Sequence, residues 1–542
     1  MLDPIQITIF DNAFASVCEE MGETLRRCAV SVNVKDRLDF SAALFDPSGQ
    51  LVAQAAHIPV HLGSMAQALR TILAEADPGP GEMVLTNDPY RGGTHLPDLT
   101  LVAGVFHRGR KIGYVANRAH HADVGGKAGA SMAPAERLED EGVVIAPMVV
   151  VRDGKLDEQA LAPLFDAVSL PDERRRDLMA QVAANQVGAR QLALLEDRTG
   201  AEALAGMMTA LMDYAERAMQ GLVRELPAGR FTFTDRLDDD GMSDAPVPIK
   251  VTIERDGDRV RVDFAGTAPC VRGNVNAVLP VTVASVFYVF RCLLGEDVPS
   301  NAGCLRPLAL HAPQGTVVNA TYPHAVAAGN VETSQRIVDT LLGALAKAWP
   351  ERIPAASCGS MNNLSLASPR FAYYETIAGG MGAGPRADGL SAVHTHMTNT
   401  RNTPVEMMEE AYPVRVHAYR TRRGSGGAGA RTGGDGVVRE LEALEPMTAA
   451  LLTERRRLAP WGLAGGKPGR RGKNALYRGG RWQTLPGKTV LELAPGERLR
   501  IETPGGGGHG AVGHGVGEHG VGGHGVADGS GPRAAERAGG TE

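Results

Sequence analysis

The sequence predicts an α+β protein of several domains, with mixed sheets and helices followed by a disordered, glycine- and histidine-rich C-terminal tail. The chain of 542 residues is long enough for two to four domains of ~100–200 residues each. Hydrophobic residues make up 43% of it, an ordinary share for a globular protein. Helical periodicity and strand-and-turn patterns occur in separate blocks along the chain, which predicts a mixed fold.

Glycine is the unusual feature of the composition. The chain has 67 glycines, about 12% of its residues, against a usual share of ~7%. They keep no three-residue period, which excludes a collagen-like helix. Aromatic residues make up only 5%. This composition predicts a protein rich in backbone turns.

Charge and hydropathy exclude several classes of protein. The formal net charge of −6 argues against a nucleic-acid partner, since such binders show a basic footprint. The segment before Arg26 holds no basic residue, unlike a secretory signal, and the longest apolar run, residues 277–290, is too short to cross a membrane. The six cysteines form no CxxC pair and are expected to be buried and reduced. We therefore expect a cytoplasmic protein without a membrane partner.

We divide the chain into three parts. Residues 1–225 are predicted to form a metal-binding domain that ends in a helical segment. Residues 226–503 are predicted to form an α+β region that completes the active site. Residues 504–542 are of low complexity, with His509, His514, His519 and His524 at five-residue steps, and we expect them to be disordered.

The elements of the first part follow from its apolar spacing. From Ile7 to Cys28, apolar residues recur at three- and four-residue steps, which indicates an amphipathic helix. Residues 31–145 are rich in strand and turn signals, including a turn at Asp46–Gly49. A helical region rich in charged residues follows over residues 161–225.

The second part begins with strands after Pro227. Asp256-Gly257 is a typical hairpin turn between two of them. Helices are expected from near Glu332 to before Pro350 and over residues 404–412. Residues 461–503 are predicted to form short strands joined by glycine turns.

The first candidate site comes from a predicted hairpin. Residues 99–106 and 112–116 are strand-like, and residues 107–110 are a plausible tight turn between them. In an antiparallel hairpin with this turn, Asp98 lies opposite Ala119 or His120, with Cβ atoms ~5 Å apart. His95 precedes Asp98 by three residues, across the bend at Pro97.

Two imidazoles and one carboxylate suit Mn²⁺, Fe²⁺ or Zn²⁺ with coordination positions left open for water or substrate. We therefore predict His95, Asp98 and His120 as metal ligands. His121 and Asp123 compete with His120 for this role, and the alternative is a set of hydrogen-bonding turn residues. The glycine pairs at 92–93 and 125–126 would allow close approach of the backbone to a ligand.

Other polar residues are candidates with less specific patterns. Asp88 could support a metal ligand, act as a general base, or form a plain Asx turn. His57 and His61 flank Pro59 and are interpreted as structural. A further group could bind substrate or could serve loop-to-helix packing: His394, His396, Asn399 and Glu406.

The sequence holds no convincing nucleotide-binding loop. The segment GLAGGKPGRRGKN has glycine and lysine but lacks the pattern GxxxxGK[ST]. No GxGxxG follows a clear strand, and no GxSxG elbow is present. If the protein uses ATP, we expect a partner chain to bind it.

Seven segments taken together resemble the hydantoinase B/oxoprolinase family. They occur in order from about residue 1 to residue 508: DFSAALFDPSGQLVAQAAHIPVHLGSM, LTNDPYRGGTHLPDLTLV, RAHHADVGG, NAGCLRPL, GNVETSQRIVDTLLGALA, AGGMGAGPRADGLSAVHTHMTNTRNTPVE and PWGLAGGKPG with its closing TPGGGG. The chain departs from the family at Thr432, where an arginine is usual, and in the His-Gly repeat after His509.

The resemblance implies a heteromeric enzyme. An A-type subunit would bind ATP and phosphorylate a cyclic amide such as a hydantoin or 5-oxoproline, and this B-type chain would open the ring at a divalent metal. The implied metal is manganese, held by His95, Asp98 and His120. Asp88 or Asp123 would carry out the proton transfer. Two alternatives stay open, a subunit of a ketone carboxylase and a non-catalytic scaffold for the ATP-binding chain.

Overall fold

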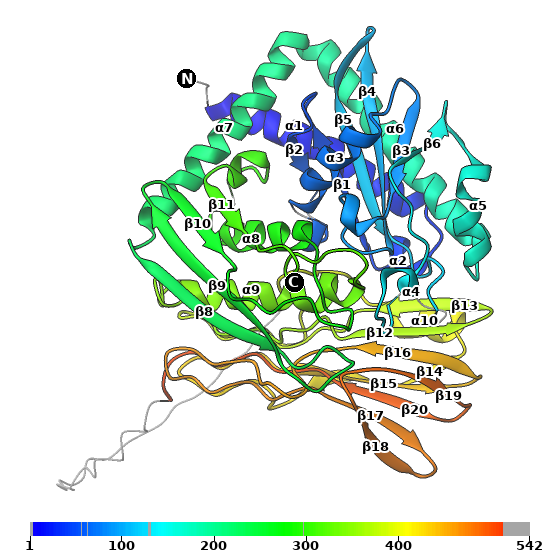
Figure 1. The fold of residues 1–542 in the computed structure, drawn as a ribbon, viewed down its shortest axis with the longest axis vertical. Coiled ribbons are helices and arrows are strands. Elements are labelled where there is room, and N and C mark those ends of the chain that lie inside the picture. The colour runs from blue at the N-terminus through cyan, green and yellow to red at the C-terminus, as the bar shows by residue number, and fades with distance from the viewer. Residues whose placement is uncertain (1–3, 56, 62, 128–131, 296, 513–542) are drawn as a thin grey trace, which may run out of the picture.

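The computed structural model describes residues 4–512 except 56, 62, 128–131 and 296. Helices and strands are mixed throughout this part, which confirms the predicted fold class (Figure 1). His514, His519 and His524 of the predicted tail lie outside the described residues. Within the described part, no helix is both long and apolar enough to cross a membrane.

The first sheet has seven strands in the order β2-β1-β5-β4-β3-β6-β7, and every neighbouring pair is antiparallel. Its strands are β1 Phe40–Phe45, β2 Leu51–Gln54, β3 Glu82–Thr86, β4 Asp98–His107, β5 Arg110–His120, β6 Met148–Arg152 and β7 Lys155–Leu156. The predicted turn at Asp46–Gly49 joins β1 to β2, with Gly49 at φ 80°.

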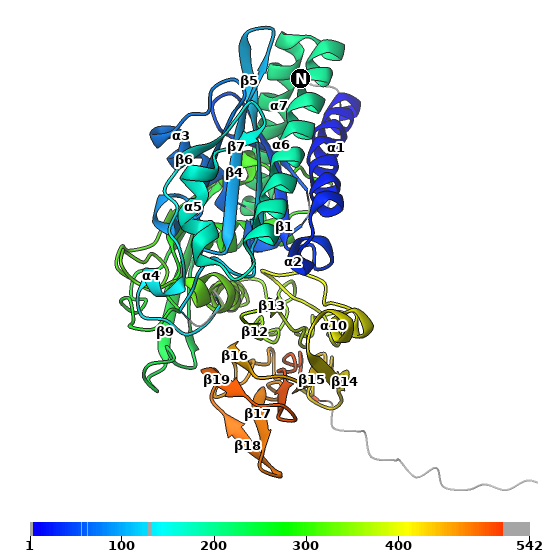
Figure 2. The ribbon, with the colours of Figure 1, turned by 90° about the vertical axis from the view of Figure 1, so that its right-hand side faces the viewer.

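Helices cover both faces of this sheet (Figure 2). On one face, α6 (Pro171–Thr199) packs against β4 and β5, and α1 (Pro4–Cys28) packs against α6. On the other face, apolar residues of α3 (Ser64–Glu75) join a separate cluster with side chains of β1 and β5. Because alternate residues of a strand point to opposite faces, the central strands β4 and β5 contribute apolar side chains to the cores on both sides of the sheet.

The long helices confirm the predicted amphipathic helix over residues 7–28 and the predicted helical region over residues 161–225. The α6 helix approaches α1 closely because it has Gly188 at the contact, where an added Cβ would lie 2.3 Å from Sδ of Met21. The remaining helices of this half are α2 Val32–Lys35, α4 Leu138–Glu141, α5 Glu158–Ala167 and α7 Ala201–Glu225, with 3₁₀ turns at Pro59–His61 and Pro89–Arg91.

A four-stranded sheet, β11-β10-β9-β8, follows in the chain and contacts α9. It consists of β8 Arg230–Leu237, β9 Val247–Asp256, β10 Arg259–Asp263 and β11 Leu308–His311. Asp256 pairs with Arg259, which confirms the predicted hairpin turn. Helices α8 (Leu279–Leu293) and α9 (Ser334–Leu345) contact each other, and one apolar core joins residues on both sides of position 225.

Two sheets complete the C-terminal half, at the lower end of the molecule in Figure 1. Their orders are β13-β12-β16-β19 and β14-β15-β20-β17-β18. The strands are β12 Asn363–Ser368, β13 Phe371–Glu375, β14 Val414–Arg422, β15 Gly436–Ala443, β16 Met447–Leu452, β17 Lys473–Arg478, β18 Arg481–Leu485, β19 Lys488–Leu493 and β20 Arg498–Glu502. The predicted helix near 404–412 is α10, Val405–Ala411.

The expectation of disorder from Gly505 onward is wrong for Gly505–Gly508. All four glycines are buried, and their backbone N–H groups donate to carbonyls of different segments, those of Arg470, Gly434, Ala356 and Lys467. A Cβ added at Gly506 would lie 2.0 Å from the carbonyl oxygen of Met381. Low sequence complexity predicted an unpacked chain, but here the absence of side chains is what lets neighbouring backbones touch.

The cysteines differ in part from expectation. All six are free, and Cys18, Cys304 and Cys358 are buried as predicted. Cys28 and Cys292 are exposed instead. Both lie in the last turn of an amphipathic helix, where the polar side faces outward.

Candidate metal site

The predicted hairpin forms in the expected register. Asp98 at the start of β4 pairs directly with His120 at the end of β5. The turn between the strands places Arg108 at φ 48° and Gly109 at φ 76°, the two positive values that a tight two-residue hairpin turn requires. The turn pairs His107 with Arg110, and a register shift between Val105 and Phe106 then places His120, rather than Ala119, opposite Asp98.

His95, Asp98 and His120 form one compact, buried group. Asp98 Oδ2 lies 3.1 Å from Nδ1 of His95, and Asp98 Oδ1 lies 3.3 Å from Nδ1 of His120. One ligand atom from each residue falls within 4.8 Å of the others, and no side chain is more than 4% exposed. The structure thus brings together the three residues that the sequence predicted as metal ligands.

The donor set fits a divalent cation. Nε2 of His120 is buried and has no hydrogen-bond partner among the described residues, although an unpaired buried polar atom costs ~1–3 kcal/mol. A cation at this point would bind the lone pair of His120 Nε2. Two imidazoles and a carboxylate suit Mn²⁺, Fe²⁺ or Zn²⁺.

The electrostatics of the group favour the protonation states that bind metals. Burial by itself raises the pKa of Asp98, but the neighbouring His95 and His61 and the hydrogen bonds to Asp98 outweigh it and hold this pKa well below its usual value. Burial lowers the pKa of His95, although Asp98 opposes this effect. The result is an ionised carboxylate beside a neutral imidazole, the forms that act as ligands.

His61 is a member of the site that the sequence interpretation missed. Its Nε2 lies 3.1 Å from Asp98 Oδ2, and its Nδ1 lies 2.9 Å from the hydroxyl of Ser41. The hydroxyl of Thr94 donates to the same Asp98 oxygen at 2.8 Å. The HxxxH spacing with His57 was the available signal, but Pro59 argued for a loop. The 3₁₀ turn Pro59–His61 is that loop, and it faces the hairpin end.

A π-helix adds a second missed residue. Gly329–Thr333 form a π turn directly before α9, where the sequence predicted only an ordinary helix start. Asn330 on this turn places its Nδ2 atom 3.5 Å from Nε2 of His95, and its Oδ1 atom is buried without a partner in the described structure. Gly329 lets the turn pack against the backbone of Asn276, since a Cβ there would lie 1.8 Å from the carbonyl oxygen of Asn276. Single π turns are frequent at functional sites.

These residues surround a cavity of about 20 Å³. Its lining comes from both halves of the chain and consists of Asp39, Ile58, Val60, His61, His95, Asp98, His120, Asn330, Val331, Met361, Tyr374, Thr376, Met397, Thr398 and Thr400. This is about the room that one water molecule or ion needs. The cavity therefore encloses the polar atoms of the site and leaves room for one water molecule or ion.

Tyr374 connects the cavity to a buried carboxyl group. Its ring stacks on His120 with centroids 4.6 Å apart, and its hydroxyl donates to Oδ1 of Asn363 at 2.7 Å. Nδ2 of Asn363 donates in turn to Oε1 of Glu332 at 2.7 Å. Burial raises the pKa of Glu332 to about 7. Both aromatic stacking and this hydrogen-bond chain fix the plane of the His120 ring.

The remaining candidates of the first half lie outside the cavity lining. Asp123 accepts backbone N–H groups of Gly125 and Ser169, both at 2.8 Å, so its carboxylate ties loops together. Asp88 caps a 3₁₀ turn by accepting the N–H of Tyr90 at 2.9 Å, the Asx-type alternative. His121 bonds to Oε1 of Gln181 at 3.1 Å. His121 follows the last residue of β5, and its ring contacts Gln181 instead of Asp98.

The four predicted substrate-binding residues are not brought together. His396 packs against Tyr288 with ring centroids 5.9 Å apart, and burial lowers the pKa of His394 to about 4. Asn399 and Glu406 are exposed. None of the four lines the cavity, whereas their neighbours Met397, Thr398 and Thr400 do.

Comparison with known proteins places the chain in a family. A family model described as hydantoinase B/oxoprolinase matches residues 3–512. The chain is 39% identical over 520 residues to a 5-oxoprolinase of Dictyostelium discoideum, and this match covers 94% of the chain but 40% of that protein. The chain thus spans about two fifths of the length of the 5-oxoprolinases of Dictyostelium discoideum, Arabidopsis thaliana and Saccharomyces cerevisiae.

Two solved structures share the fold. An ATP-dependent caprolactamase from Pseudomonas jessenii matches with a TM-score of 0.87 at 28% identity, covering 94% of this chain and 92% of that one. A nucleotide-free acetone carboxylase matches with a TM-score of 0.85 over 94% of this chain and 76% of that one, and its 17% identity supports the fold alone. The family model over nearly the whole described chain confirms the resemblance found in the sequence, and the protein belongs to the hydantoinase B/oxoprolinase family.

Proposed function

We propose that the chain is the metal-binding, B-type component of an ATP-dependent cyclic-amide hydrolase. The observation that carries the proposal is the buried group of His95, Asp98 and His120, with a free Nε2 atom on His120. Support comes from the relatives named 5-oxoprolinase and from the structural likeness to a protein named ATP-dependent caprolactamase.

The proposal assigns ATP to a partner. The sequence holds no nucleotide-binding loop of the known kinds. The chain matches 92% of the caprolactamase chain but only two fifths of the 5-oxoprolinases, which leaves the larger part of those long chains for other tasks. In the proposal, a separate A-type subunit binds ATP and phosphorylates the carbonyl oxygen of the cyclic amide, which makes the resonance-stabilised amide easier to attack.

The residues of the cavity would hold the cation and the reacting group. His95, Asp98 and His120 would be the ligands, with manganese as the first choice and zinc or iron as alternatives. Such a cation supplies Lewis-acid polarisation of a carbonyl or phosphoryl oxygen and lowers the pKa of a water molecule. Asn330 would donate from Nδ2 to the oxygen that becomes negative, because its side chain already faces His95.

Substrate entry requires an opening of the cavity. At about 20 Å³ it is too small for a five- or seven-membered ring. The lining segments from Ile58 to His61 and from Met397 to Thr400 are loops or a 3₁₀ turn, so we assign the opening to them. Asp88 and Asp123 line no part of the cavity. A role for either in proton transfer would therefore need the same rearrangement.

The direct test combines this chain with its A-type partner, ATP and a panel of cyclic amides: 5-oxoproline, hydantoin and caprolactam. Ring opening coupled to ATP cleavage is the expected result, with loss of activity in Asp98→Asn and retention in His121→Ala. The His121 variant is the matched control because it removes a neighbouring buried imidazole outside the cavity. Absence of ATP-dependent ring opening across the panel would refute the proposal.

The same assay separates the two alternatives. Turnover that requires acetone or acetophenone and bicarbonate would identify a ketone carboxylase, for which the 17% identity of the solved neighbour supplies only the fold. Activity that survives the double change His95→Ala, His120→Ala would identify a scaffold. Metal analysis should use a chain ending at residue 512, because tail histidines bind metals on their own.

A further inference from the structure

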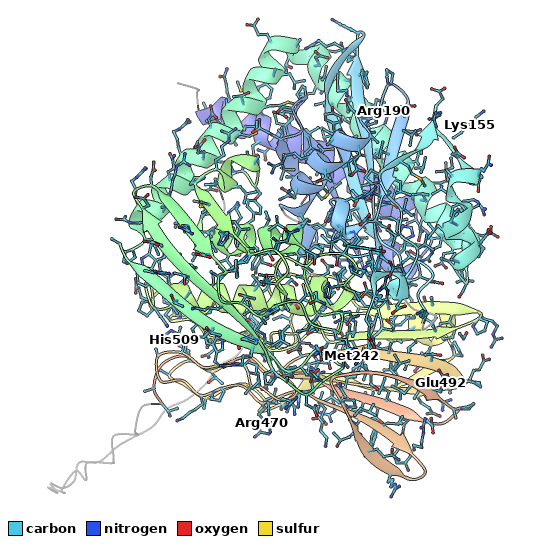
Figure 3. All side chains as sticks on the ribbon, in the orientation of Figure 1. Lys155, Arg190, Met242, Arg470, Glu492 and His509 are labelled. Atoms are coloured by element: carbon cyan, nitrogen blue, oxygen red, sulfur yellow. The ribbon has the colours of Figure 1, made fainter. Side chains whose placement is uncertain are left out.

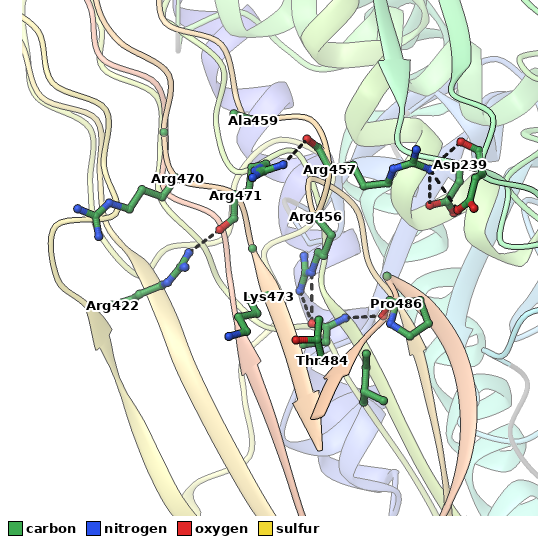
Figure 4. A pocket seen from close by; sticks show the side chains of 16 residues that line it. Asp239, Arg422, Arg456, Arg457, Ala459, Arg470, Arg471, Lys473, Thr484 and Pro486 are labelled. Atoms are coloured by element: carbon green, nitrogen blue, oxygen red, sulfur yellow. Dashed lines mark hydrogen bonds and ion pairs between the residues drawn. The ribbon is translucent and has the colours of Figure 1, made fainter. Parts of the chain in front are cut away.

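A second, larger pocket lies at the far end of the molecule from α6, between the C-terminal sheets and the loop after β8 (Figure 4). Its volume is about 750 Å³, within the ~300–1,000 Å³ typical of small-molecule sites. It shares no lining residue with the metal cavity. Six of its lining residues are cationic: Arg422, Arg456, Arg457, Arg470, Arg471 and Lys473.

The acidic lining residues do not neutralise this charge. Asp239 is engaged by Lys488 at 3.1 Å, and Asp244 is engaged by Arg457 at 3.4 Å. Arg422 pairs with Glu502 at 3.0 Å. After these pairs, four cations remain without a carboxylate within salt-bridge distance among the described residues: Arg456, Arg470, Arg471 and Lys473.

The side chain of Arg456 forms the floor of the pocket. Its guanidinium donates to Oδ1 of Asn474 at 2.9 Å, to Oδ1 of Asn362 at 2.6 Å and to the backbone carbonyl of Glu454 at 2.7 Å, all neutral acceptors. Gly472 makes room for it, since a Cβ there would lie 2.9 Å from Cζ of Arg456. Burial lowers the pKa of Arg456 to about 10, against the opposing effect of the Glu332, Asp238 and Glu454 carboxylates.

The rim carries the unpaired cations. Arg470 and Lys473 are exposed, and Figure 4 draws no interaction from either side chain to the other lining residues. Among the described residues, the one hydrogen-bond acceptor of the Arg471 side chain is the carbonyl oxygen of Arg457, at 3.1 Å. All three belong to the segment GRRGK, the glycine- and lysine-containing stretch that fits no nucleotide-loop pattern.

Recognition here must come from side chains. The backbone N–H groups of Gly469, Arg470 and Gly472 donate to carbonyl oxygens of Pro460, Ser425 and Arg455. They are therefore not free to cradle a phosphate as a P-loop does. Planar guanidinium forks instead bind phosphate oxygens in pairs, and a lysine adds a point charge.

From this geometry we infer that the pocket binds a small molecule that carries two or more linked phosphate groups. The buried guanidinium of Arg456 meets the inner phosphate, and the rim cations Arg470, Arg471 and Lys473 meet the outer ones. The site is separate from the metal cavity and does not depend on the proposed hydrolase activity. A nucleotide and an inorganic polyphosphate share this chemistry.

Calorimetric titration of the full chain with inorganic tripolyphosphate, without added metal, tests the inference. The double variant Arg470→Gln, Lys473→Gln should bind at least ~10-fold more weakly, since each lost cation removes a charge-assisted contact. The matched control is Lys155→Gln, Arg190→Gln, which removes the same charge from exposed positions at the opposite end of the molecule (Figure 3). Binding by the control and by Asp98→Asn should stay unchanged.

Three outcomes would overturn the inference. The first is no binding of tripolyphosphate at low salt. The second is equal weakening in both double variants, which indicates general attraction to charge. The third is citrate binding as tightly as tripolyphosphate, which removes the preference for phosphate. Parallel titrations with ADP and pyrophosphate identify the source, because tighter binding of ADP indicates a nucleotide and equal binding indicates the phosphate chain alone.

Discussion

His61 and Asp98 contact each other through Nε2 and Oδ2 at 3.1 Å, and the other nitrogen of His61 lies 2.9 Å from the hydroxyl of Ser41. The contact links the 3₁₀ turn Pro59–His61 and strand β1 to the carboxylate between His95 and His120. Because both nitrogens of His61 are used, its ring is fixed. It orients the Asp98 carboxylate, and the first prediction follows from that role.

We predict that His61→Ala weakens metal binding by ~10–100-fold, the usual cost of losing a group that orients a ligand. Titration of the metal-free chain ending at residue 512 with Mn²⁺ or Zn²⁺ measures this. His57→Ala is the control, because His57 lies on the same segment outside the cavity lining. Unchanged affinity in His61→Ala would show that Asp98 is oriented without it.

A second prediction concerns Asn330. In Asn330→Ala the metal content should stay near that of the native protein, while kcat falls by ~10²–10³, the cost of removing one donor to a developing negative oxygen. Metal analysis and turnover with the A-type partner give the two readouts. Loss of metal together with activity would instead make Asn330 a ligand.

The third prediction concerns the pH dependence of stability. Glu141 accepts backbone N–H groups of Val326 and Ala327 at 3.0 and 2.8 Å, and burial raises its pKa to about 7. Between pH 4.5, the ordinary pKa, and pH 7, the Glu141 carboxyl group is therefore protonated in the folded state and ionised in the unfolded state. Stability from this group is present below that range and is lost as the pH rises, by about 3 kcal/mol in total.

Glu141→Gln should flatten this loss, because a carboxamide does not titrate. The variant should also lose ~1–3 kcal/mol of unfolding free energy at every pH. Its amide nitrogen replaces one carboxyl oxygen and cannot accept the hydrogen bond from the backbone N–H that faces it. Urea unfolding of both proteins from pH 4.5 to 7.5 measures the two effects. An identical pH slope in the two proteins would contradict the assignment to Glu141.

The fourth prediction concerns a buried ion pair. Nζ of Lys488 lies 2.6 Å from Oε1 of Glu454, and both side chains are almost fully buried. Lys488→Met keeps the side-chain volume but leaves a buried carboxylate with one cation fewer, so we expect a loss of ~3–5 kcal/mol in unfolding free energy. Lys473 on strand β17 of the other C-terminal sheet is exposed, so Lys473→Met should change stability by less than ~0.5 kcal/mol. Equal effects of the two changes would refute the prediction.

The fifth prediction tests the packed glycines. Gly506→Ala should destabilise the fold severely, because its Cβ would lie 2.0 Å from the carbonyl oxygen of Met381. Gly206→Ala is the control, since Gly206 lies within α7 and an added Cβ there meets nothing within 4 Å. That change should stabilise by up to ~1 kcal/mol through helix propensity. Thermal unfolding of the two variants compares them, and tolerance of Gly506→Ala would show that the backbones can separate.

The sequence by itself determined the local parts of the fold. Apolar spacing predicted α1, since an amphipathic pattern needs only a core to face, and residues 161–225 were predicted to be helical. The tight turn at Arg108-Gly109 predicted that Asp98 would lie opposite Ala119 or His120, and the register shift between Val105 and Phe106 decided for His120. His95 followed because it lies three residues away.

Only the tertiary structure decided the rest of the site. Asn330 lies 235 residues after His95, and Tyr374 belongs to a strand of a different sheet, so no local pattern could have joined them. The choice between His120 and His121 depended on which face of β5 meets Asp98. The buried glycines at 505–508 depended on segments around Ala356, Gly434 and residues 467–470 meeting there. Short-range rules set the hairpin, whereas burial between distant segments closed the cavity around it.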